Sequence, residues 1–189
     1  VSRQALNQHI QVLMAQGKVR KTGSTRGATY SLCEGGKAPE SARHGFPLDG
    51  LREDEVFERF SRELALSSRA AKPAFEAFRY AFTEMVNNAV DHSGAARCEI
   101  EVHVEDYAMS FSVRDHGVGV FSTIAAKLGL PSEEEAMREL LKGKTTTLPS
   151  RHSGEGIFFS SKAADVFVLR SHRLTVEFDR GRRDTFVRT

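Results

Sequence analysis

The chain has 189 residues, of which 40% are hydrophobic and 28% charged, and its formal net charge is +2. This composition is typical of a globular protein that is long enough to bury a core without a metal or a disulfide. No apolar run reaches the roughly 18 residues that span a bilayer, and Cys33 and Cys98 lack metal-ligand spacing. We therefore expect a cytoplasmic protein with free thiols and no membrane contact.

The first 33 residues are strongly basic, whereas the rest of the chain is not. They hold five basic residues and no acidic one, a net charge of +5; since the whole chain carries +2, the remainder carries −3. A basic head on a mildly acidic body predicts two modules with different partners. Because the chain begins at Val1 and is helical in pattern from its start, we expect it to be a fragment.

Residues 1–33 are predicted to form a helix and a β-hairpin whose strands lie at 19–22 and 28–32. An apolar stripe at helical spacing indicates the helix: Leu6, Ile10, Leu13 and Met14. The segment VSRQALNQHIQVLMAQGKVRKTGSTRGATYSL resembles the recognition helix and wing of MarR-like winged helix-turn-helix domains. The resemblance implies that duplex DNA is a partner, with base edges read by the helix and phosphates contacted by the wing. The implied DNA contacts are Arg3, Gln4, Asn7, Lys21 and Arg26; the alternative is a solvated helix and hairpin that pack on the larger domain.

Residues 34–50 are predicted to be a linker, because they contain turn-forming residues and almost no apolar periodicity. The larger domain is then expected at 51–189, and it begins with a helix at 51–66. A second helix starts near Pro73 and ends at Ser93-Gly94. Its predicted core stripe is Phe75, Phe78, Phe82, Met85 and Ala89.

Glu84 and Asn88 share another face of this second helix, since they are four residues apart. A carboxylate and an amide one turn apart can hold a divalent cation and orient a water molecule. By themselves such pairs are more often simply solvated, so the spacing alone is a weak signal.

Two strands are predicted next, at 98–104 and 107–113, from the alternation of apolar and polar residues. Asp115 continues the alternation of the apolar residues of the second strand, so its side chain is expected to point inward. A carboxylate in that position is costly unless it is paired. Gly117 and Gly119 follow it, and they allow the backbone to turn sharply and to approach a ligand closely.

Four segments in this order, FTEMVNNAVDHSG, VRDHGVG, HSGEGI and DTF, resemble the motifs of the GHKL superfamily of ATPases over roughly residues 73–189. That superfamily includes histidine kinase catalytic domains, bacterial anti-sigma kinases, gyrase B and MutL. The resemblance implies a domain that binds ATP or ADP together with Mg²⁺. It implies that Asn88 binds the Mg²⁺ ion, that Glu84 is the general base, and that Asp115 accepts the adenine amine. The other implied nucleotide contacts are Gly117, Gly119, Gly154, Gly156 and Thr185.

Two positions depart from the pattern of the superfamily. Glu155 stands between the last two glycines, where its charge must point away from a triphosphate. Asp184 stands before Thr185, where a glycine is common.

Residues 120–153 correspond to the ATP lid of the superfamily. Ser132 and Glu135 form a capping box for a helix whose apolar face is Met137, Leu140 and Leu141. Lys144 or Arg151 would close on the γ-phosphate, and the alternative for each is a solvated loop residue.

A helix at 157–164 and three strands, at 165–171, 173–179 and 184–189, complete the prediction. Together with the earlier strands they predict a mixed sheet covered by helices on one face. The expected fold class is therefore α+β, a two-layer α/β sandwich of the GHKL (Bergerat) type with a partial winged helix at residues 1–33.

Three functions compete. A nucleotide-responsive, DNA-binding transcription regulator is favoured by the fused basic head. An anti-sigma-like protein kinase, which transfers the γ-phosphate to a partner protein, fits the motifs equally well, whereas a histidine kinase would need a histidine at the head of a long dimerisation helix. A mechanical ATPase of the MutL or gyrase type would need a second domain that supplies a lysine. A second copy of the chain is a further candidate partner.

Overall fold

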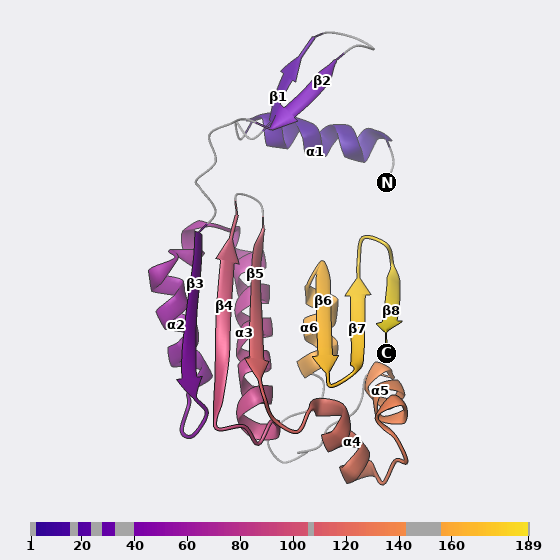
Figure 1. Ribbon diagram of the computed structural model, residues 1–189. Coiled ribbons are helices and arrows are strands. Elements are labelled where there is room, and N and C mark those ends of the chain that lie inside the picture. Colours follow the sequence, from indigo (N-terminus) through magenta and orange to yellow (C-terminus); the bar gives the residue numbers. More distant parts are fainter. Residues whose placement is uncertain are drawn as a thin grey trace. The chain divides into compact units, whose positions relative to one another are not determined.

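The structure, a computed structural model, describes residues 3–15, 19–23, 28–32, 40–105, 108–142 and 156–188 (Figure 1). The chain divides into two compact units, Val1–Pro39 and Glu40–Thr189. None of the helices in the described ranges combines the length and the apolar character that a bilayer crossing requires.

The first unit contains the predicted helix and hairpin. Helix α1 (Arg3–Ala15) is followed by the antiparallel strands β1 (Val19–Thr22) and β2 (Thr29–Leu32). The predicted apolar stripe of α1 is only partly covered, since Leu6 is 53% exposed and Ile10, Leu13 and Met14 are half-buried. This small unit therefore has no closed hydrophobic core among its described residues.

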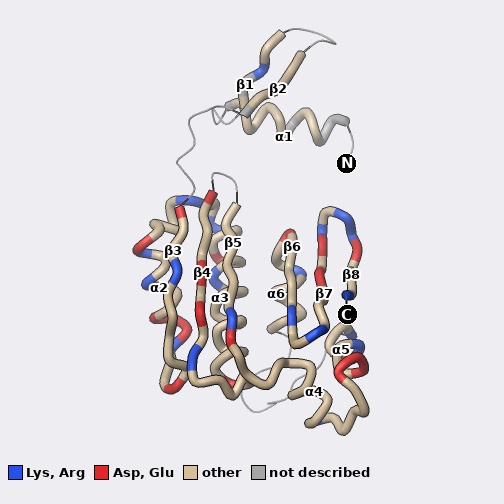
Figure 2. Tube along the Cα trace, viewed as in Figure 1, with Lys and Arg blue, Asp and Glu red and all other residues tan. Residues whose placement is uncertain are grey.

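The second unit opens with a three-stranded antiparallel sheet in the order β3-β4-β5. Its strands are β3 (Glu40–Pro47), β4 (Arg97–Val104) and β5 (Met109–Asp115). The predictions for β4 and β5 are confirmed, because alternate residues of β4 are buried: Cys98, Ile100, Val102 and Val104. The other face of the sheet carries charged residues, such as Arg43 and Glu99, which form an ion pair of 2.5 Å (Figure 2).

The prediction of a linker at 34–50 was wrong for its second half, which forms β3. Ala42 and Phe46 point inward and are buried, and His44 packs between them and bonds to Glu63 of the following helix. Gly45 and Pro47 disguise this alternation, because both residue types are rare inside strands. Pro47 is tolerated because β3 is an edge strand and Pro47 is its last residue.

Helices cover one face of this sheet (Figure 1). They are α2 (Glu53–Glu63), the short 3-10 helix η2 (Leu66–Ser68) and α3 (Lys72–His92). The core between the layers is aromatic: the ring centroids of Phe57 and Phe60 lie 5.4 and 5.8 Å from that of Phe82. Met85, predicted as a core residue, is half-buried and outside this cluster, whereas its neighbour Val86 is fully buried.

A second three-stranded antiparallel sheet is formed by β6 (Val166–Ser171), β7 (Leu174–Asp179) and β8 (Asp184–Arg188), in that order. Helices α4 (Val120–Leu128), α5 (Glu133–Leu141) and α6 (Gly156–Ala163) accompany it. A second hydrophobic cluster joins α4, α5 and β7 through Phe121, Ile124, Ala136, Met137, Leu140, Leu174 and Val176. Helix α6 packs against α3, and α2, α3 and α6 lie on one side of the strands, whereas α4 and α5 lie near the lower ends of the strands in Figure 1.

The α+β class is therefore confirmed. The prediction of a single mixed sheet was wrong, because the described residues of this unit form two separate antiparallel sheets. Strands β5 and β6 point in the same direction (Figure 1), but no pairing joins them in the part of the chain that the structure describes. The connection between them forms α4 and α5, whose apolar residues pack on β7 and give the second sheet its own core. The segment predicted as an ATP lid thus begins with two helices, of which α5 was predicted and α4 was not.

Candidate functional site

Glu84 meets the start of α6. A Cβ atom added to Gly156, the first residue of α6, would lie 2.0 Å from the Glu84 carboxylate oxygen Oε2, so the carboxylate occupies the space beside this glycine. Glu84 comes from α3, where the two helices pack together. The structure thus brings together two predicted site residues that are 72 positions apart in the sequence. A carboxylate at a helix N-terminus also stabilises that helix through its dipole, which is an alternative role for Glu84.

Asn88 lies one turn further along α3. Its side-chain nitrogen Nδ2 is buried and has no hydrogen-bond partner among the described residues. A buried amide with an unsatisfied donor is costly, and in a native structure it calls for an explanation such as a bound ligand or ion. The described residues contain no cluster of three His, Cys, Asp or Glu side chains that could hold a metal ion.

The loop after β5 is held by its own aspartate and by the end of α3. Asp115 Oδ1 accepts a hydrogen bond of 3.0 Å from the Gly117 amide. The Val118 amide donates to the Ser93 carbonyl oxygen at 2.8 Å. A Cβ atom on Gly117 would lie 1.9 Å from that same carbonyl oxygen, so only glycine fits there. The loop therefore packs closely on the protein itself, at the end of α3, and its close approach to a ligand stays a prediction.

Asp115 is half-buried and lies opposite Cys98 in the β4–β5 pair. Burial raises the pKa of the Cys98 thiol, and the negative charge of Asp115 raises it further. The bond from the Gly117 amide engages one oxygen of the Asp115 carboxylate. The second oxygen remains the predicted acceptor for a ligand.

Gly119, the second glycine of the loop, is the N-cap residue of α4 and has a φ of 79°. A Cβ atom on it would lie 2.5 Å from Ser171 Oγ at the end of β6. Positive φ and lack of space both require glycine at this position.

Thr185 is not brought to Asp115. It is exposed on β8, and β6 and β7 lie between that strand and β5 (Figure 1). Lys144 and Gly154 lie outside the described residues, as does Arg26 of the basic head. Arg3, Gln4 and Asn7 lie on α1, where Asn7 is exposed, and Lys21 is exposed on β1.

The predicted cap of α5 is confirmed, because Ser132 Oγ accepts a hydrogen bond of 3.3 Å from the Glu135 amide.

The sequence interpretation missed three residues that contact the loop of Gly117 and Gly119: Ser93, Ser171 and His172. Ser93 was recognised only as the end of a helix, and the other two belong to a short polar turn between strands, which carries no functional signal.

Comparison with known proteins finds no matching family model and no similar curated protein.

Proposed function

We propose that the unit Glu40–Thr189 binds a magnesium–adenine nucleotide in the manner of GHKL ATPases. The observation that supports this most is the contact of Glu84 with the first residue of α6, one helical turn from the unsatisfied amide of Asn88. A helix N-terminus offers free N–H groups to an anion. Because the Glu84 carboxylate lies beside Gly156, a phosphate group there would need the Mg²⁺ ion to offset the repulsion between the two negative charges.

The roles of the side chains follow from their chemistry. Asn88 would donate from Nδ2 to a phosphate oxygen and bind Mg²⁺ through its amide oxygen. When bound, the ion neutralises phosphate charge. Glu84 would accept a proton from the attacking hydroxyl or water, and Asp115 would accept the adenine amine through the oxygen that Gly117 does not use.

The decisive experiment is calorimetry of Mg-ATP binding with Asp115→Asn. Asparagine can keep the bond from the Gly117 amide through its oxygen, but its NH₂ group then faces the adenine amine, donor against donor. We expect affinity to fall roughly tenfold to hundredfold, since a hydrogen bond to a charged group contributes about 1.5–3 kcal/mol. Asp165→Asn, at an exposed aspartate, is the matched control. Unchanged affinity in Asp115→Asn would refute the adenine site.

We further propose that the chain is a nucleotide-responsive DNA-binding regulator. The helix and hairpin of the first unit, with Asn7 and Lys21 exposed on them, support this proposal. About three phosphate contacts would give a log–log salt slope near −3, and Lys21→Ala should reduce it by about one unit without altering sequence preference. Nucleotide and DNA should change each other's affinity by the same factor. If no DNA is bound at low salt with or without ATP, the kinase alternative takes precedence.

An assay with labelled ATP distinguishes hydrolysis, transfer of the γ-phosphate to a protein, and sensing of the nucleotide. Release of free phosphate indicates hydrolysis, label on a partner protein indicates a kinase, and neither indicates that the nucleotide is only sensed. In any of the three cases the nucleotide must bind first, so this assay follows the calorimetry.

A further inference from the structure

The turn between β6 and β7 contains a histidine in a conformation that favours glycine. Ser171 pairs with Leu174, so the turn consists of His172 and Arg173 alone. His172 has a φ of 51°. Glycine adopts positive φ at little cost and is the usual residue in such two-residue turns. A histidine there indicates that its side chain has a role, since strained backbone is retained where the surroundings require it.

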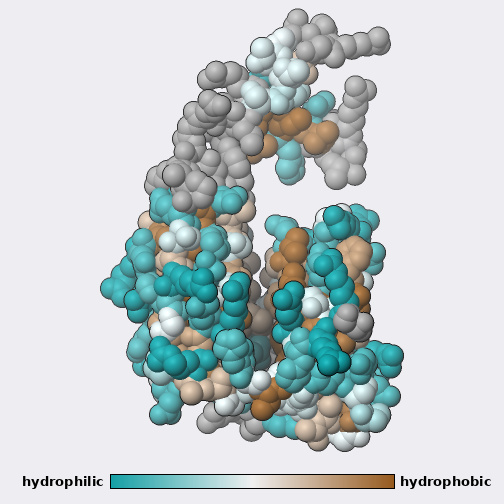
Figure 3. Space-filling view, in the orientation of Figure 1, coloured by the Kyte–Doolittle hydropathy of each residue, from teal (hydrophilic) through white to brown (hydrophobic). Residues whose placement is uncertain are grey.

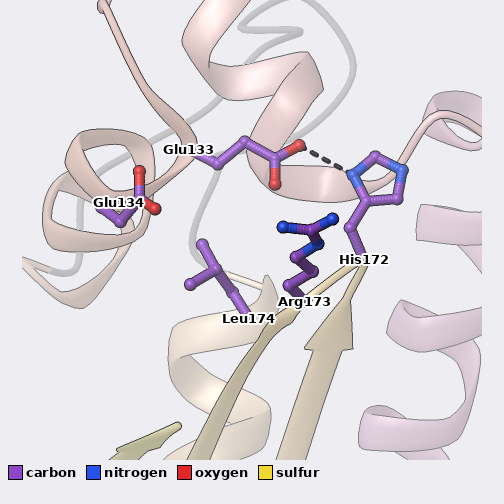
Figure 4. A pocket seen from close by; sticks show the side chains of 5 residues that line it. All are labelled: Glu133, Glu134, His172, Arg173 and Leu174. Atoms are coloured by element: carbon purple, nitrogen blue, oxygen red, sulfur yellow. Dashed lines mark hydrogen bonds and ion pairs between the residues drawn. The ribbon is translucent and has the colours of Figure 1, made fainter. Parts of the chain in front are cut away.

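The His172 side chain joins the turn to both neighbouring helices. Its Nδ1 atom lies 2.8 Å from Oε1 of Glu133, the first residue of α5 (Figure 4). The same carboxylate oxygen accepts a hydrogen bond from the Ser122 hydroxyl on α4. Glu133, His172, Arg173 and their neighbours line a pocket of about 600 Å³ at this place. One carboxylate therefore connects α4, α5 and the turn.

The other edge of the His172 ring faces the glycine loop. A Cβ atom on Gly119 would lie 3.2 Å from Cε1 and 3.4 Å from Nε2 of His172, and 2.5 Å from Ser171 Oγ. Gly119 also accepts hydrogen bonds at its carbonyl oxygen from the amide and the hydroxyl of Thr123, at 3.1 and 3.0 Å. Gly119 thus packs against the β6–β7 turn, while Gly117 and Val118 contact Ser93 at the other end of the loop.

We propose that His172 is a positioning residue for the nucleotide site: held by Glu133, its ring keeps Gly119 in place and so presets the loop that begins at Asp115. This inference rests on the proposed function. A loop shaped in advance binds its ligand more tightly, because less ordering is required on binding. The arrangement also links the site to α4 and α5, so a movement of these helices would change the loop.

Two substitutions separate the side chain from the backbone of the turn. In His172→Gly the positive φ is retained without strain, but the bond to Glu133 and the ring are lost. In His172→Asn the residue still tolerates positive φ and its amide nitrogen, like Nδ1, is three bonds from Cα and can donate to Glu133, but the ring edge that faces Gly119 is lost. Arg173→Ala is the control, since it alters the same turn and pocket without touching Glu133 or Gly119 in the contacts described.

The first measurement is hydrogen exchange of the amides of residues 117–123 without nucleotide. We expect exchange to be about threefold to tenfold faster in both His172→Gly and His172→Asn, which lack the ring, and close to wild type in Arg173→Ala. Unchanged exchange in His172→Gly, or exchange equally fast in Arg173→Ala, would overturn the proposal.

The second measurement is Mg-ATP affinity by calorimetry. We expect a loss of about threefold to tenfold in both His172→Gly and His172→Asn, and none in Arg173→Ala. Faster exchange with unchanged affinity would show that the turn holds the loop without serving the nucleotide, which overturns the positioning role. If the wild-type chain binds no Mg-ATP, the proposed function itself fails, and the exchange experiment still decides whether His172 holds Gly119.

Discussion

The two halves of the unit Glu40–Thr189 differ in how completely they are buried. Around α2 and α3, Phe57, Phe60 and Phe82 are each at most 1% exposed. The second sheet has a smaller core, and Val166 and Val168 on β6 are 56% and 53% exposed. Figure 3 shows hydrophobic surface, in brown, in the region of β6. The first half thus provides the more completely buried scaffold, whereas the second is held partly by polar contacts such as that of His172 with Glu133. The candidate site combines residues of both halves.

The largest expected effect is in the aromatic core. Phe82→Ala should lower the free energy of unfolding by about 3–5 kcal/mol, because it removes a ring that Phe57, Phe60 and Phe111 enclose. Urea denaturation measures this, with Phe159→Ala at a ring that is 46% exposed as the control. Equal effects of the two substitutions would contradict the description of the first half as the scaffold.

A smaller loss is expected where the loop meets α3. Gly117→Ala should cost about 1–3 kcal/mol, because the new methyl group meets the Ser93 backbone, which cannot move away cheaply. Gly129→Asn is the matched control, since Gly129 has a φ of 64°, which asparagine tolerates, and open space around it. Thermal unfolding compares the two; a stable Gly117→Ala would mean that the loop can move away from the helix.

The metal assignment predicts a selective loss. Asn88→Ala should weaken ATP binding about tenfold and adenosine binding little, because the amide and its ion would act only on the phosphates. Calorimetry with both ligands tests this, and equal losses would place the metal elsewhere.

Glu84→Ala should reduce the rate of ATP turnover more than it reduces the affinity for ATP. If turnover persists unchanged, its contact with α6 is structural.

The smallest effect concerns acid stability in the second half. The hydrogen bond from Ser122, and then that from His172, hold the pKa of Glu133 below its ordinary value of 4.5. A lowered carboxyl pKa stabilises the fold above the ordinary value, and this contribution is lost as the pH falls through the folded-state pKa. Glu133→Gln should therefore flatten the stability profile below about pH 4.5, where wild type and variant converge. Ser122→Ala should shift the profile in the same direction; an unchanged profile in both would exclude Glu133 as the group responsible.

Most elements could be predicted from local pattern. The alternation along β4, the apolar stripe of α3 and the Ser132 cap of α5 each reflect interactions within a few residues, and the structure confirms the first and the third, and the second except at Met85. Strand β3 could not be recognised, since its alternation rests on Ala42 and Phe46 with a glycine and a proline among their neighbours. Its burial is decided by β4 and α2, which come later in the chain.

The sequence by itself determined which residues are candidates for chemistry: a carboxylate and an amide one turn apart, and an aspartate followed by two glycines. Only the tertiary structure decided which distant residues these side chains contact. The contact of Glu84 with Gly156 joins residues 72 positions apart, and His172 reaches Gly119 and Glu133 from a turn without any recognisable motif. It also decided that β5 and β6 stay unpaired within the described residues. Local patterns record which face of an element is apolar, whereas contacts between distant segments depend on how the layers pack, and no short stretch of sequence contains that information.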